Sequence, residues 1–291
     1  MSRPDRPHSR RSCLSVPGSS QRKLAKAAEL AADEVVIDLE DAVAVAAKDE
    51  ARAATVAALR DWTGPRVAVR VNAPGTPWCH LDVAALGALA ELPASIVVPK
   101  VESPGDLAFI DRLLDGVEAG AGRRRPLRVQ ALIETAAGLA RVQEIAASSP
   151  RLDTLILGYA DLAASLGGTR DLDAWLPAQH GLLVAARANG LQAIDGPHLG
   201  VGADEAFHAA AARARDLGFD GKWAIHPSQV DALNQAFTPN EAEVQRARAV
   251  VDALERAERE TGQGAVTLDG EMLDEAVRAA ALRVLARVDT A

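Results

Sequence analysis

Short runs of aliphatic and β-branched residues recur along the chain at intervals of about 30 residues, the length of one strand–helix–strand unit. Eight such runs lie at 12–18, 34–41, 66–72, 95–102, 127–135, 154–162, 191–198 and 221–229. Ala-rich, charge-bearing stretches with helical periodicity lie between them, for example at 20–33, 47–61, 104–118, 137–149 and 203–217. Nearly continuous apolar strands that alternate with helices indicate a parallel sheet buried on both faces. Eight units favour an α/β fold of the closed TIM (β/α)8 barrel type over residues 11–238.

An open, doubly wound sheet is the alternative fold. No G-x-G-x-x-G follows any of the runs, so the usual nucleotide-binding signature of that alternative is missing. After the barrel, residues 239–261 predict one long charged helix, and a second helix is expected at 274–288. We expect this C-terminal helical extension, 239–291, to dock on its own barrel or on a neighbouring subunit. Residues 1–10 are basic without an apolar stretch behind them, which predicts a disordered tail.

Composition excludes several classes of protein. Hydrophobic residues make up 48% of the 291 residues but aromatic residues only 3%, so the core must be aliphatic. A net charge of −8 argues against a nucleic-acid binder, which needs a basic face. No apolar run approaches the roughly 20 residues of a membrane span. Cys13 and Cys79 are too few for a disulfide framework, so we expect a reducing, cytoplasmic location.

Ionisable groups stand at the C-terminal ends of seven successive runs, from the second to the eighth. They are Asp38, Glu40 and Asp41, then Arg70, Lys100 with Glu102, Glu134, Asp161, Asp195 with His198, and His226. In a barrel of this kind the strand ends meet at one mouth, the usual place for an active site. A single such residue is more simply a helix cap or a loop contact. Seven in succession favour one shared site.

Several carboxylates without a cysteine cluster or a zinc-type histidine spacing favour a hard cation such as Mg²⁺. Glu134 and Asp161, on adjacent strands, are the expected ligands, and Arg70 offers a bidentate fork for a substrate carboxylate. Lys100 could form a Schiff base, but with Glu102 beside it an electrostatic role is favoured. No G-x-S-x-G elbow is present, so covalent acyl chemistry fits poorly. The small residues 136–138 after Glu134 are expected to leave room for metal, water and substrate.

Nearly the whole chain, from about residue 10 to 288, resembles the citrate lyase β-subunit-like branch of the HpcH/HpaI aldolase superfamily, the CoA ester lyases. The resemblance rests on eight segments in the family's order. They are SVPGSS, VVIDLEDAVAVAAKDEAR, RVNAPGTPWCHLDV, VVPKVESPGDL, ALIETAAGL, LGYADLAASLG, KWAIHPSQV and DGEMLDEAVRAA.

This resemblance implies a Mg²⁺-dependent TIM barrel that cleaves a carbon–carbon bond in a short 3-hydroxyacyl-CoA. It implies that Glu134 and Asp161 bind the metal, that Arg70 holds the acid end of the substrate, and that Glu40 and Asp41 hold metal-bound waters. It further implies a homo-oligomer, a trimer or hexamer, in which Asp274 of a neighbouring subunit carries the proton. Without the resemblance, Asp274 is more simply an N-cap of the last helix.

The CoA thioester needs phosphate contacts, and the loop PGSSQRK after the first run suggests them. Gly18, Arg22 and Lys23 lie where this loop enters a helix, whose N-terminus favours anions. A solvated helix face explains the two basic residues equally well. Two segments depart from the family pattern: Ala160 stands where an acid is common, and HLGVGADEAF at 198–207 replaces a more acidic run.

Three close activities stay open within this resemblance: a malyl-CoA or citramalyl-CoA lyase, a citrate lyase β subunit that acts on an acyl-carrier-protein thioester, and a malyl-CoA thioesterase. A metal-dependent pyruvate aldolase without CoA is more distant. From a different class, the chain could be a catalytically silent barrel that binds a ligand.

Overall fold

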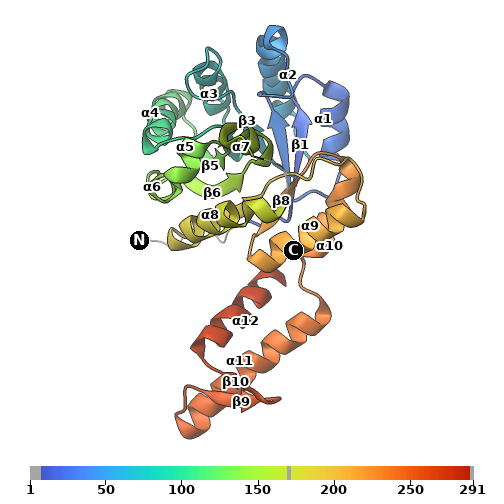
Figure 1. Ribbon diagram of the computed structural model, residues 1–291. Helices are drawn as coiled ribbons and strands as arrows, with labels where there is room; N and C mark the ends of the chain where they lie inside the picture. Colours follow the sequence, from blue (N-terminus) through green and yellow to red (C-terminus); the bar gives the residue numbers. More distant parts are fainter. Residues whose placement is uncertain (1–7, 169–171, 289–291) are drawn as a thin grey trace. The chain divides into compact units, whose positions relative to one another are not determined.

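Within residues 8–168 and 172–288, which the computed structural model describes, eight parallel strands close into a barrel in sequence order (Figure 1). The strands are β1 (Ser12–Pro17), β2 (Glu34–Asp38), β3 (Arg66–Arg70), β4 (Ser95–Val98), β5 (Arg128–Ile133), β6 (Leu152–Leu157), β7 (Gln192–Asp195) and β8 (Gly221–Ala224). Pairing of β1 with β8 closes the barrel. The predicted TIM barrel is confirmed.

Helices follow the strands as the periodicity predicts. They are α1 (Gln21–Ala28), η1 (Val45–Ala47), α2 (Lys48–Arg60), α3 (Cys79–Gly87), α4 (Pro104–Ala121), α5 (Ala136–Ala140), α6 (Val142–Ala146), α7 (Tyr159–Leu166), η2 (Leu172–Trp175), α8 (Leu176–Ala188), α9 (Glu205–Leu217), η3 (Pro227–Gln229) and α10 (Val230–Phe237). The helix expected over 137–149 is two short helices, because the backbone at Arg141 leaves the helical region (φ −113°, ψ 15°). None of the helices in the described ranges is long and apolar enough to cross a membrane.

The centre of the barrel is filled by one side chain from each strand. These buried residues are Cys13, Val36, Ala68, Val97, Leu132, Ile156, Ile194 and Trp223. Inward-pointing side chains fill a closed barrel in this way, so its interior is a packed core. Seven of the eight are small or aliphatic, as the low aromatic content predicts, and the indole of Trp223 is the exception.

A buried ion cluster lies at the N-terminal ends of the strands. The Arg10 guanidinium donates to the Glu34 carboxylate (Nε–Oε1 3.2 Å) and to the Thr154 hydroxyl (2.9 Å), and Glu34 also accepts from Gln130 (2.8 Å). Arg10 is only 3% exposed. A buried arginine needs an anionic partner, and the Glu34 carboxylate is that partner. The disordered tail expected over 1–10 therefore does not include Arg10, and residues 1–7 lie outside the described residues.

The chain from Gln235 onward belongs to a second compact unit, whereas Arg10–Asn234 form the first. Its elements are α11 (Glu241–Thr261), β9 (Val266–Leu268), β10 (Glu271–Leu273) and α12 (Glu275–Val288). Asn240 and Glu243 form a capping box at the start of α11, as the sequence signal there predicts. The Gly-bearing segment between the two helices is an antiparallel hairpin of β9 and β10. The two helices and the hairpin share a small core that includes Val250, Leu254 and Leu273.

We predict that replacement by alanine has opposite effects on the free energy of unfolding at two helical glycines, Gly181 and Gly138. A Cβ at Gly181 in α8 would meet no described atom within 4 Å, so Gly181→Ala should raise the free energy of unfolding by about 0.5–1 kcal/mol. A Cβ at Gly138 in α5 would overlap the carbonyl oxygen of Val101, so Gly138→Ala should lower it. Urea denaturation of both variants measures the effects, and equal shifts would contradict the packing described here.

Candidate active site

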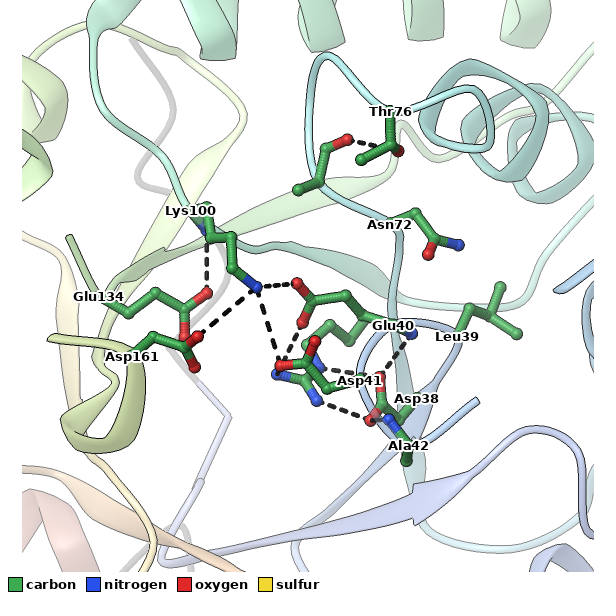
Figure 2. A network of polar contacts seen from close by, with 12 residues as sticks. Asp38, Leu39, Glu40, Asp41, Ala42, Asn72, Thr76, Lys100, Glu134 and Asp161 are labelled. Atoms are coloured by element: carbon green, nitrogen blue, oxygen red, sulfur yellow. Dashed lines mark hydrogen bonds and ion pairs between the residues drawn. The ribbon is translucent and has the colours of Figure 1, made fainter. Parts of the chain in front are cut away.

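The C-terminal ends of β2 to β6 bring six ionisable side chains into one polar network (Figure 2). Its members are Asp38, Glu40, Arg70, Lys100, Glu134 and Asp161, and the more exposed Asp41 lies at its edge. All of them are strand-end residues that the sequence places at the mouth. The predicted convergence of these strands is therefore seen in the structure.

Glu134 follows β5 directly and is 2% exposed. Its Oε1 accepts the backbone N–H of Lys100 at 3.0 Å. Gly158, at the end of β6, makes room for this carboxylate, because a Cβ there would lie 2.7 Å from both Cβ and Oε2 of Glu134. Gly158 thus contributes to the site because it has no side chain where the Glu134 carboxylate lies.

The charged form of Glu134 is unfavourable in the metal-free protein. Burial and the nearby carboxylate of Glu40 raise the pKa of Glu134 to about 8, against the opposing charges of Lys100 and Arg70. A further cation beside Glu134 would favour its charged form and lower its pKa. Figure 2 shows the carboxylate of Asp161, in the first turn of α7, close to that of Glu134.

Glu134 and Asp161 together fit a Mg²⁺ ion. Among the described residues, no group of three or more His, Cys, Asp or Glu side chains is arranged to hold a metal. Mg²⁺ needs fewer, since it is usually bound through one or two carboxylates, with water and substrate oxygens as its other ligands. Asp161 is 39% exposed and so is open to such an ion, whereas Glu134 lies beneath the surface.

Arg70 differs from its expected role in one respect. Arg70 and Asp38 are register partners on β3 and β2, and one side of the guanidinium fork already donates to Asp38 (Nε–Oδ1 2.8 Å, Nη2–Oδ2 2.6 Å). Burial disfavours the guanidinium charge, but the hydrogen bonds and charge of Asp38 raise the pKa of Arg70 above its usual value. The Nη1 end of the fork faces Glu40 Oε2 at 3.0 Å without a hydrogen bond to it, so a substrate carboxylate would share this end with Glu40.

The Arg70 guanidinium also lies over the Trp223 indole, with Cζ 5.6 Å from the ring centroid. This is a cation–π contact in a buried setting. Asp38 and Trp223 therefore fix Arg70 from two directions. Trp223 was not predicted at the site, whereas Asp38 was predicted at the mouth as a strand-end residue without a role of its own. Its place at the end of β2, beside the expected position of Arg70, was the available signal for that role.

Glu40 and Asp41 lie on the loop after β2. Glu40 is buried, with Oε2 3.0 Å from Nη1 of Arg70 and Oε1 in contact with the Lys100 ammonium. Burial raises the pKa of Glu40, while Arg70 and Lys100 oppose that rise. Asp41 is 56% exposed and lies 3.7 Å from Nζ of Lys100. Both acids thus face the expected metal ligands across Lys100.

Lys100 pairs with Glu40 instead of Glu102, which is exposed. Burial lowers the pKa of Lys100, but the hydrogen bond and charge of Glu40 more than offset this and raise it. A Schiff base requires a neutral amine, so this environment supports the electrostatic role and disfavours the class I aldolase alternative.

Several predicted site residues lie outside this network. Arg22 and Lys23 are exposed on α1, and Gly18 is buried, where a Cβ would crowd the Thr55 hydroxyl at 2.7 Å. Asp274 belongs to the second unit and caps α12 by accepting the N–H of Val277 (3.1 Å). The structure therefore shows the capping role of Asp274, and its proton-transfer role stays a prediction.

The strand-end residues of β7 and β8 also lie outside the network. Asp195 binds the buried Lys222 ammonium (2.5 Å) and the Tyr159 hydroxyl, and His226 contacts the Ser228 hydroxyl (2.8 Å). Tyr159 begins α7, so its bond to Asp195 anchors the helix that carries Asp161. Lys222, which interrupts an otherwise apolar strand, was not predicted from the sequence.

The small residues after Glu134 have a packing role that the sequence did not indicate. Gly138 is buried against the backbone of Val101, and Thr135 caps α5 by accepting the Gly138 N–H (3.1 Å). For Gly138, close approach of two backbones is the reason for the small residue. Gly158 makes room for the Glu134 side chain.

The chain is similar to several known proteins. The sequence model of the HpcH/HpaI aldolase/citrate lyase family matches residues 11–227. An L-malyl-CoA/beta-methylmalyl-CoA lyase of Cereibacter sphaeroides (strain ATCC 17029 / ATH 2.4.9) is 39% identical over 280 residues, which cover 89% of this chain and 88% of that protein. A (3S)-malyl-CoA thioesterase of the same strain is 40% identical over 288 residues, 97% of this chain and 95% of that protein.

Among solved structures, protein CitE from Mycobacterium tuberculosis, in complex with magnesium, acetoacetate and coenzyme A, superposes with a TM-score of 0.79. It is 33% identical, and the match covers 98% of this chain and 99% of that one. The family match spans most of the barrel, and the relatives extend it over nearly the whole chain. This chain therefore belongs to the HpcH/HpaI aldolase/citrate lyase family.

Proposed function

We propose that the protein is a Mg²⁺-dependent lyase that cleaves the carbon–carbon bond of a short 3-hydroxyacyl-CoA of the malyl-CoA or citramalyl-CoA type. The products are acetyl-CoA, or a homologue, and a 2-oxo acid. The observation that carries this proposal is the pair Glu134 and Asp161 near the Arg70 guanidinium, whose Nη1 end is not engaged by Asp38 and faces Glu40. This pair suits a hard cation and the fork suits a carboxylate, which together recognise a 2-hydroxy or 2-oxo acid.

Glu134 and Asp161 would hold the metal ion, and Glu40 and Asp41 would hold water next to it. When bound, the ion would supply Lewis-acid polarisation of the substrate oxygen that becomes the keto group. The partly exposed Asp161 leaves an open side for the substrate, and buried Glu134 anchors the other.

Arg70 orients the acid end of the substrate through the Nη1 end of the guanidinium, which Asp38 does not engage and Glu40 faces. In the cleavage direction the substrate hydroxyl passes its proton to solvent water, the bond to the carbon next to the thioester breaks, and the electron pair moves to that carbon as an enolate. Asp274 then delivers a proton to the enolate carbon. Atoms balance, because one proton leaves the hydroxyl and one is returned to carbon.

The CoA phosphates bind near the start of α1, where the side chains of Arg22 and Lys23 provide donors for anions. Gly18 is buried and its N–H donates to the Asp38 carbonyl (2.8 Å), so it shapes the loop before α1 and is not available as a phosphate donor. Arg22 and Lys23 are exposed, as a phosphate contact requires. We further propose that Asp274 comes from a neighbouring subunit of a homo-oligomer, a trimer or hexamer, and that the protein is cytoplasmic.

Hydrolysis of the thioester is the second candidate, because the (3S)-malyl-CoA thioesterase matches the chain as well as the lyase does. A citrate lyase β subunit, which would act on a citryl thioester of acyl-carrier protein, is a third. A silent binding barrel would not need the costly burial of Glu134 beside Asp161.

A coupled assay over malyl-, citramalyl- and citryl-CoA tests the lyase proposal. We expect Mg²⁺-dependent release of a 2-oxo acid together with an acyl-CoA, and no free thiol in the first products. Free CoA thiol released together with the intact hydroxy acid, and without a 2-oxo acid, would instead identify a thioesterase. Absence of a 2-oxo acid from all three esters and from citryl-acyl-carrier protein would show that the proposed activity is wrong.

Mg²⁺ binding should release a proton at neutral pH. The pKa of Glu134 is about 8 in the metal-free protein, and a carboxylate must be ionised to bind the ion. Affinity should therefore rise about tenfold per pH unit up to about pH 8 and level off above it. Titration calorimetry in buffers of different ionisation enthalpy measures the proton. Glu134→Gln is the control, since it should weaken Mg²⁺ binding by more than about 100-fold and remove the pH dependence.

Asp274→Asn should leave substrate binding unchanged and lower kcat by about 10²–10⁴-fold, because the amide cannot transfer the proton. Asn is also a good N-cap, so α12 should stay folded. Arg70→Ala should also be nearly inactive, because it lacks the guanidinium that orients the acid end of the substrate. If the two residues act in different subunits, mixing the variants under exchange conditions restores part of the activity, whereas mixed oligomers without activity would place both residues in one chain.

A further inference from the structure

The Lys100 ammonium occupies the middle of the carboxylate cluster. Figure 2 shows it between Glu134 and Asp161 on one side and Glu40 and Asp41 on the other. Its Nζ contacts Glu40 closely, lies 3.7 Å from Asp41 Oδ2 and 3.9 Å from Asp161 Oδ1. One monovalent cation therefore faces three carboxylates, one of which is an expected metal ligand.

Charge balance explains why a cation is held there. Arg70 is paired with Asp38 and Glu40, and its Nη1 lies 4.0 Å from Asp41 Oδ2. The Lys100 ammonium approaches Asp41 more closely (3.7 Å) and also lies 3.9 Å from Asp161. Without it, the neighbouring carboxylates would repel one another in a partly buried site. Only solvent or bound counter-ions would then reduce the free energy of that repulsion.

The backbone at Lys100 holds the side chain in this place. Its φ is +51°, in the left-handed region that a residue with a Cβ rarely adopts. In that conformation its N–H donates to Glu134 Oε1 (3.0 Å) while the side chain leaves toward Glu40. Lys100 thus contacts Glu134 through its backbone and lies near Asp161 through its ammonium. Because local strain of this kind persists only where the surroundings enforce it, the placement is specific.

We propose that Lys100 is the built-in counter-cation of the metal site: its ammonium neutralises the cluster in the metal-free protein and is displaced toward Glu40 and Asp41 when Mg²⁺ binds. This proposal rests on the metal site of the proposed function. The ammonium ends a flexible four-carbon chain and is 32% exposed at the side-chain level, so it can move while its backbone bond to Glu134 stays in place.

The proposal has an unusual consequence for affinity. A residue that only supports the fold should weaken Mg²⁺ binding when it is removed, whereas a competing cation should strengthen it. Repulsion between a single and a double charge about 6 Å apart, in water-like surroundings, corresponds to about a tenfold change in affinity. Lys100→Met should therefore lower the Kd for Mg²⁺ by about tenfold or more, although it removes a polar contact.

The experiment compares Lys100→Met with two controls by titration calorimetry with MgCl₂ at pH 8.5, where Glu134 is largely ionised. Lys100→Arg keeps the charge and should leave the Kd within about threefold of the unaltered protein. Lys26→Met removes a lysine from the exposed face of α1, outside the cluster, and should leave the Kd unchanged. Thermal unfolding gives a second readout: the rise in Tm on adding Mg²⁺ should be larger for Lys100→Met than for the unaltered protein.

Amine labelling tests the displacement on the unaltered chain, so the proposal does not depend on a variant that folds. With limiting acetic anhydride, Mg²⁺ should raise acetylation of Lys100 several-fold relative to Lys26, as read by mass spectrometry of the peptides. In Glu134→Gln, which should not bind the ion, Mg²⁺ should leave the ratio unchanged.

The outcomes are distinct. A Kd for Lys100→Met that is unchanged or higher in the folded variant, or labelling of Lys100 that does not increase with Mg²⁺, overturns the counter-cation role and leaves the lyase proposal standing. Failure of the unaltered protein to bind Mg²⁺ overturns the metal site itself, and with it both proposals.

Discussion

The burial of Glu134 at the mouth of the barrel is the constraint on which the rest of the site depends. A carboxylate that is 2% exposed loses most of its hydration, and its charged form is then unfavourable by several kcal/mol unless cations compensate it. The surroundings supply compensation only in part: one backbone N–H, the distant charges of Arg70 and Lys100, and the space left by Gly158. A raised pKa is the result. The site therefore carries more negative than positive charge, and a divalent cation can balance the difference.

Arg70 shows how the same fold prepares for a second ligand. A lone buried guanidinium would be unstable, and Asp38 stabilises it through a bidentate pair on the neighbouring strand. Because Asp38 engages one side of the planar fork, the other end has a fixed direction, and Trp223 supports its face. Such preorganisation lowers the entropy that a substrate carboxylate loses on binding. A lysine at this position could not be fixed in this way, since its ammonium has no plane.

Much of the fold and part of the site could be predicted from the sequence, for a physical reason. The 30-residue repeat of apolar runs determines the barrel, and the barrel topology determines that strand ends meet. Glu134, Asp161, Arg70 and Glu40 therefore fall together without knowledge of any distance. The partners of these residues could not be predicted in the same way. Lys100 pairs with Glu40 across two strands instead of with adjacent Glu102, because φ at Lys100 turns its side chain inward.

Arg10 and Lys222 were not predicted for a related reason. The pattern of hydrophobic residues identifies apolar faces, but it does not identify a buried charge whose partner is far away in sequence. Glu34 and Asp195, the partners of these two cations, lie on other strands. Asp274 is the opposite case. Its sequence pattern is that of an N-cap, and the cap of α12 explains that pattern, so the local structure by itself does not indicate a catalytic role. A catalytic role for such a residue depends on what its carboxylate meets in the assembled protein. The capping bond occupies Oδ1 and leaves the other oxygen able to carry a proton, so the two roles are chemically compatible.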